Sequence, residues 1–86
     1  MESGELVVKV FGYQKDSEEL IELQEVSFQS DIRELDKIIE FLQEVKEHHS
    51  KVIGEVELCH SHFRDWDVGW KAGSTDIIVV TTSKDK

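Results

Sequence analysis

The residues of this chain that could do chemistry gather in the stretch CHSHFRDWDVGW, from Cys59 to Trp70. On a strand, His60 and His62 would point to the same face with their backbones roughly 7 Å apart, a spacing that can serve a metal ion. A zinc site needs a third and usually a fourth ligand. The candidates for these ligands are Cys59, Asp65, Asp67 and Asp76. None of them stands at a recognised metal-binding spacing, so we expect neither a bound metal nor another cofactor.

Acid–base catalysis is the next possibility, because His60 or His62 beside Asp65 could form a dyad whose imidazole titrates near neutral pH. The sequence shows no glycine-rich phosphate loop, no serine elbow and no evident set of oxyanion donors. Cys59 lacks a flanking signal that would lower its thiol pKa, so we interpret it as a small buried side chain in a strand. We therefore predict that the chain is not an enzyme. The alternative is a small metal-binding or hydrolase-like protein centred on His60, His62 and Asp65.

The two tryptophans of the chain, Trp66 and Trp70, favour a binding surface. One of them is expected to close the end of the small core. The other, together with nearby Asp65 and Asp67, has the composition of an interface hot spot. Either tryptophan could be the buried one, and the sequence leaves this open.

The elements that position these residues begin with two predicted strands, at about 5–13 and 20–29, joined by the turn QKDSE. In the second strand Ile21 and Leu23 lie on one parity, whereas Val26 and Phe28 lie on the other. A β-bulge near Gln24 would bring both pairs to the same face.

A helix is predicted from about Asp31 to about His49, because Ser30 or Asp31 can cap it and Glu34 follows Asp31 at the spacing of a capping box. Its apolar stripe, expected to lie on the sheet, consists of Ile32, Leu35, Ile38, Ile39, Leu42 and Val45. Opposite the stripe stands an acidic column of Asp36, Glu40, Glu44 and Glu47. Such a column is either a solvated face or an acidic ridge that attracts lysines and arginines of a partner.

Two more strands follow, at about 55–63 and 76–82, separated by a long loop that contains Gly69 and Gly73. The apolar run DIIVVTT predicts a last strand that is covered on both sides. The order is β-β-α-β-β. It predicts an α+β, two-layer fold in which one helix packs on a mostly antiparallel four-stranded sheet, as a single domain over residues 1–86.

Composition agrees with a small binding protein. The chain has 86 residues, 38% of them hydrophobic, and a net charge of −9. This charge repels nucleic acid and anionic membranes at long range and favours a basic partner. A lone cysteine, no basic start followed by an apolar run, and no stretch long enough to span a membrane predict a cytoplasmic protein.

The ordered run of ELQEVSF, a helix with ELDKIIEFL, then HSHFRDW, Trp70 and a terminal DIIVV resembles small immunity proteins of bacterial polymorphic toxin systems, in particular the immunity protein 32 family. The likeness spans about Leu6 to Val80 and rests on short motifs. It implies a cytoplasmic inhibitor that binds and neutralises one cognate toxin. The positions that match are His60, His62, Asp65, Trp66, Trp70 and Asp76.

The residues and the resemblance together predict a protein-binding module whose partner is a basic toxin domain. Asp36, Glu40 and Glu44 would steer association, and the loop with Asp65, Trp66, Asp67 and Trp70 would anchor it. A third possibility is a self-associating structural domain whose terminal strand pairs with another copy. The sequence leaves open whether the protein is a monomer or a homodimer.

Overall fold

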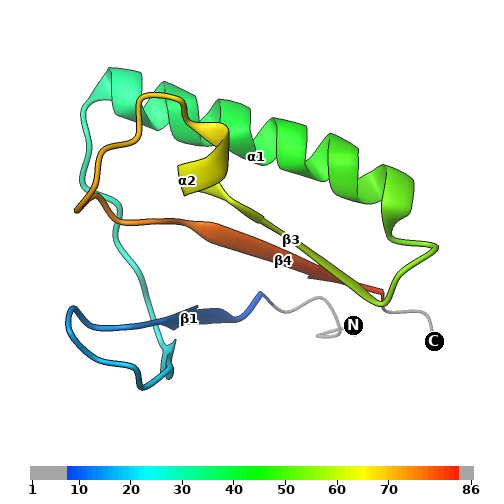
Figure 1. Cartoon of the computed structure of the whole chain (residues 1–86), viewed down its shortest axis with the longest axis horizontal. Coiled ribbons are helices and arrows are strands. Elements are labelled where there is room, and N and C mark those ends of the chain that lie inside the picture. Colours follow the sequence, from blue (N-terminus) through cyan, green and yellow to red (C-terminus); the bar gives the residue numbers. More distant parts are fainter. Residues whose placement is uncertain (1–7, 84–86) are drawn as a thin grey trace.

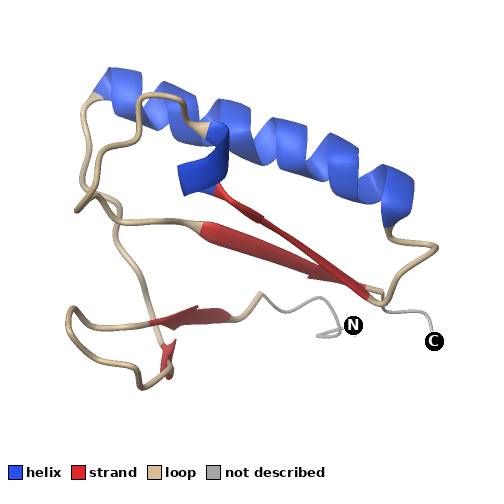
Figure 2. Cartoon of the chain, viewed as in Figure 1, coloured by secondary structure: helices blue, strands red, loops and turns tan. Residues whose placement is uncertain are grey.

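A computed structural model describes residues 8–83 and shows one long helix on a pair of strands, with a separate hairpin on the far side of that pair (Figure 1). The elements are β1 (Val10–Gly12), β2 (Ile21–Leu23), α1 (Ile32–Val52), β3 (Leu58–His62), α2 (Phe63–Trp66) and β4 (Ile78–Thr82). The α+β class is confirmed. The single four-stranded sheet is wrong, because within residues 8–83 β1 pairs only with β2 and β3 only with β4, in two antiparallel sheets (Figure 2).

The β1–β2 hairpin is shorter than predicted. Val10 lies opposite Leu23 and Gly12 opposite Ile21, and residues 5–7 of the predicted first strand lie outside the described part of the chain. The second strand ends at Leu23, before the predicted bulge, so no bulge forms there. Val26 and Phe28 follow as exposed residues. The reason is physical: among the described residues neither hairpin strand has a second strand partner that would extend its ladder.

Helix α1 begins as predicted, with Asp31 as its N-cap. The Oδ1 atom of Asp31 accepts a hydrogen bond of 2.8 Å from the backbone N–H of Glu34, which satisfies one of the free donors of the first turn. The helix ends at Val52, three residues beyond the predicted end at His49. Within residues 8–83, neither helix has the length and apolar run that a membrane crossing requires.

The face that α1 buries differs from the predicted stripe. Phe41, Val45 and His49 are buried on it, with Ile38 packed partly against the same core. Four members of the predicted stripe stay largely open: Ile32 is 72% exposed, Leu35 40%, Ile39 47% and Leu42 43%. Because the apolar arc of α1 is wider than two strands, the β3–β4 pair covers only one side of it.

An aromatic cluster forms the core under α1. The ring of Phe41 meets that of Phe63 edge-to-face at 5.2 Å between centroids, and Trp66 lies 5.6 Å from Phe41. Such pairs add about 0.5–1.5 kcal/mol to the free energy of area burial. Phe63 and Trp66 belong to α2, a single helical turn inside the segment that was predicted to be an irregular loop.

The two faces of the β3–β4 sheet differ. Ser61 and Thr81 face α1, where both contact His49. His60 and His62 lie on the opposite face, opposite Val80 and Ile78 of β4. The prediction that β4 is covered on both sides is wrong, since Ile78 and Val80 are exposed.

Candidate functional site

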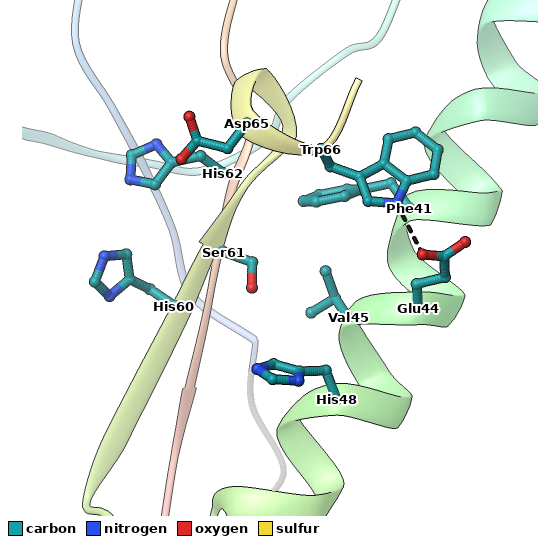
Figure 3. A pocket seen from close by; sticks show the side chains of 9 residues that line it. All are labelled: Phe41, Glu44, Val45, His48, His60, Ser61, His62, Asp65 and Trp66. Carbon is teal, nitrogen blue, oxygen red and sulfur yellow. Dashed lines mark hydrogen bonds between the residues drawn. The ribbon is translucent and has the colours of Figure 1, made fainter. Parts of the chain in front are cut away.

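The main hollow of the molecule is a cleft of about 480 Å³ along the edge of β3. Its walls come from α1, β3 and α2, so it lies at the side of β3 that does not pair with β4 (Figure 3). Its lining residues are Phe41, Glu44, Val45, His48, His60, Ser61, His62, Asp65 and Trp66. The fold therefore brings into one cleft five of the residues that the sequence predicted for partner binding: Glu44, His60, His62, Asp65 and Trp66.

Trp66 is held in a fixed orientation at this cleft. Its ring stacks on Phe63 with 5.7 Å between centroids, and its indole N–H donates a hydrogen bond of 3.0 Å to Oε1 of Glu44 (Figure 3). The side chain is half-buried, so one part of the indole belongs to the core and another part borders the cleft. An aromatic ring that is already ordered loses little entropy when a partner packs against it.

The cleft is lined by carboxylates from two elements. Glu44 is exposed on α1, and Asp65 is exposed on α2, where its Oδ1 lies 3.8 Å from Nε of its neighbour Arg64. Glu40 and Asp36 are exposed about one and two turns, respectively, before Glu44 on the same helix. Exposed like charges in a chain of net charge −9 give this side of the molecule a negative potential that attracts cations.

His62 is paired, but with Asp76 rather than with Asp65. Its Nδ1 lies 2.6 Å from Oδ2 of Asp76, while Oδ1 of Asp76 accepts a hydrogen bond of 2.8 Å from the backbone N–H of Arg64. Partial burial raises the pKa of Asp76, but the hydrogen bonds from His62 and Arg64, with their charges, outweigh it and lower the pKa below its ordinary value. Asp76 thus joins the start of α2 to the segment before β4.

The His62–Asp76 pair lies beside a second histidine. The ring of His60 stands 5.5 Å from that of His62, centroid to centroid. Across residues 8–83, no group of three or more His, Cys, Asp or Glu side chains is arranged to hold a metal ion. A histidine oriented by a carboxylate is one element of a catalytic or metal site, and here the pair also joins the end of β3 to the segment before β4.

Two other residues of the predicted binding loop have structural roles. Asp67 accepts a hydrogen bond of 3.0 Å from the backbone N–H of Gly69 and lies 3.6 Å from Nζ of Lys37 on α1. The indole N–H of Trp70 points to the carbonyl of Thr75 at 3.5 Å, and its ring packs against the core. Both tryptophans are half-buried and both pack against the core, so they do not divide into one buried and one partly exposed ring.

His49 is a residue whose role the sequence analysis missed. It is 2% exposed, with Nδ1 2.8 Å from the hydroxyl of Thr81 and Nε2 2.9 Å from the hydroxyl of Ser61. Burial lowers its pKa, and the charges of His48 and His60 lower it further. The signal was present in the sequence, because Phe41, Val45 and His49 are spaced four residues apart on one helix face.

Comparison with known proteins adds no relative to this description. No protein-family model matches the chain, and no curated protein and no solved structure matches it either. The function is therefore argued from the geometry of the cleft.

Proposed function

We propose that this chain is a cytoplasmic protein-binding module that neutralises a basic toxin domain by occupying it, in the manner of the immunity proteins that it resembles. Its partner surface is the cleft at β3 with the adjoining acidic residues of α1. The proposal requires no catalytic step and no cofactor. A lysine or arginine of the partner enters the cleft and lies against Glu44 and Trp66, which both line it.

The observation that carries this proposal is the bond between Trp66 and Glu44, 3.0 Å long, at the mouth of the cleft. It places a carboxylate beside an aromatic ring, and a cation is attracted both by the carboxylate and by the ring face. Arginine suits such a site best, because its planar guanidinium stacks on rings and pairs with carboxylates. The exposed Asp65 adds a second negative group at the other wall.

The acidic residues outside the cleft supply long-range attraction. Asp36 and Glu40 are exposed on α1, on the same helix as Glu44. They can attract the partner without touching it. Charges at the rim of an interface act on the association rate and are screened over about 10 Å at 0.1 M salt. Replacing both by neutral residues should therefore slow association and flatten its salt dependence.

The test uses binding kinetics with the protein product of the neighbouring gene as the probe. Trp66→Phe keeps an aromatic ring in the core but removes the indole N–H, and it should speed dissociation at least tenfold, as expected for an interface anchor. Trp70→Phe is the matched control, since that indole points to Thr75. Glu44→Gln should weaken binding, with Glu55→Gln as the control for loss of one exposed carboxylate. Equal effects of each variant and its control, with all four folded, would refute the proposal.

A further inference from the structure

One side of α1 is apolar and has no cover. Ile32, Leu35, Ile39 and Leu42, here called the outer stripe, recur three and four residues apart and are all exposed. An amphipathic helix buries its apolar arc in its final folded form, because exposed apolar surface costs about 25 cal/mol per Å². A contiguous patch of this kind marks a site of association.

The outer stripe reaches the unpaired side of β4 at Leu42. A groove of about 250 Å³ runs between α1 and β4, and Leu42 of the stripe lines it. The groove is bordered on the helix side by Leu42, Val45, Lys46, His49, Ser50 and Ile53, and on the strand side by Val79 and Thr81. The open flank of α1 and the open edge of β4 are thus parts of one surface.

The edge of β4 has none of the usual protection against pairing. Its five residues, Ile78–Thr82, include no charged residue and no proline, and among residues 8–83 its only strand partner is β3. Natural edge strands carry lysine, proline or bulges that prevent another strand from adding.

The accessible surface area of the chain is larger than that of a compact chain of the same mass. The accessible area is 7518 Å², whereas a compact chain of 9.9 kDa exposes about 5,200 Å². If the ten residues outside the described range are counted as wholly exposed, an excess of about 1,100 Å² still remains. A standard interface buries about 800 Å² on each partner, so a dimer needs only part of this excess, and the remainder includes exposed apolar residues outside the outer stripe.

We propose that the outer stripe and the free edge of β4 form the interface with a second copy of this chain. The two β4 strands pair antiparallel about a two-fold axis, which joins the two β3–β4 pairs into one four-stranded sheet. Such an interface is self-complementary, because each copy offers the same surface to the other. The proposal concerns a surface separate from the cleft at β3, which stays open in the dimer.

Simple geometry supports this arrangement. Each α1 lies over its own β3–β4 pair, so the two helices of the dimer are separated by two strand spacings, or about 9.6 Å. Packed helices stand 8–10 Å apart, so the two α1 helices come within packing distance when the strands pair, each with the flank that carries the outer stripe turned toward the other. One operation therefore covers both the edge of β4 and the apolar flank of α1.

Sedimentation equilibrium from about 1 to 100 µM in 0.3 M salt tests the proposal, because this salt screens the repulsion between two chains of net charge −9. The wild-type chain should be dimeric. Raising the salt concentration should increase the affinity of the two copies for each other, whereas it should decrease the affinity for a basic partner. Ile39→Glu places a charge in the middle of the outer stripe and should weaken the dimer at least about a hundredfold. Val68→Glu adds the same charge at a fully exposed site outside the interface and should leave it unchanged.

Amide hydrogen exchange then identifies what covers β4. The amides on the free edge of β4 belong either to Val79 and Thr81 or to the residues that alternate with them. Their protection from hydrogen exchange should rise with protein concentration and fall in Ile39→Glu. A monomer across the whole range would overturn the proposal, as would equal effects of the two glutamate variants. Strong protection of both edges of β4 in the monomer would also overturn it, because the chain itself would then cover that edge.

Discussion

Replacing Phe41 tests which side of α1 faces the core. Phe41 is 1% exposed and contacts the rings of Phe63 and Trp66, so Phe41→Ala should lower the free energy of unfolding by about 3–5 kcal/mol. The free energy of unfolding of a chain of this length is about 4–13 kcal/mol in total, so Phe41→Ala could remove most of it. Phe41→Leu, with an expected loss of about 1–2 kcal/mol, is therefore the variant to quantify. Ile32→Ala on the outer stripe is the comparison, because Ile32 is 72% exposed.

The expected loss for Ile32→Ala is below about 0.5 kcal/mol, because little area is lost and alanine is the better helix former. The assay is urea unfolding followed by tryptophan fluorescence, since Trp66 lies 5.6 Å from Phe41. The measurement is made at a protein concentration at which sedimentation equilibrium finds a monomer, so that the outer stripe stays exposed. A loss at Ile32 as large as that of Phe41→Leu would refute the orientation of α1 described above.

Two further predictions concern the histidines. The pKa of His49 lies below its ordinary value of 6.5 in the folded chain, so the unfolded chain binds more protons below that pH. The free energy of unfolding should therefore be highest above pH 6.5. It should fall as the pH drops toward the pKa of His49 in the folded chain, by up to about 1.4 kcal/mol per pH unit. Urea midpoints between pH 7.5 and 5 should show this slope in the wild type and a smaller one in His49→Gln; an equal slope in both would exclude His49 as its source. We also expect no tightly bound metal at His60 and His62, to be checked by elemental analysis after dialysis against a chelator. Stoichiometric zinc that disappears when both are changed to alanine would contradict this.

Local signals in the sequence predicted the main elements well. Asp31 caps α1 as its spacing to Glu34 indicated, and His60 and His62 share one face of β3 as strand alternation requires. Both depend on residues that are within four positions of one another. Interactions at this range follow from backbone geometry alone, so they can be read without knowledge of the rest of the fold.

The tertiary structure decided which way α1 faces and which partners the histidines have. Apolar residues cover so wide an arc of α1 that Leu35 or Phe41 could equally face the core, and only the position of the β3–β4 pair selects Phe41. In the same way His62 meets Asp76 across 14 residues and His49 meets Thr81 across 32. These contacts depend on where separate elements come to rest against each other, and that is determined by packing over the whole chain rather than by the spacing of neighbouring residues.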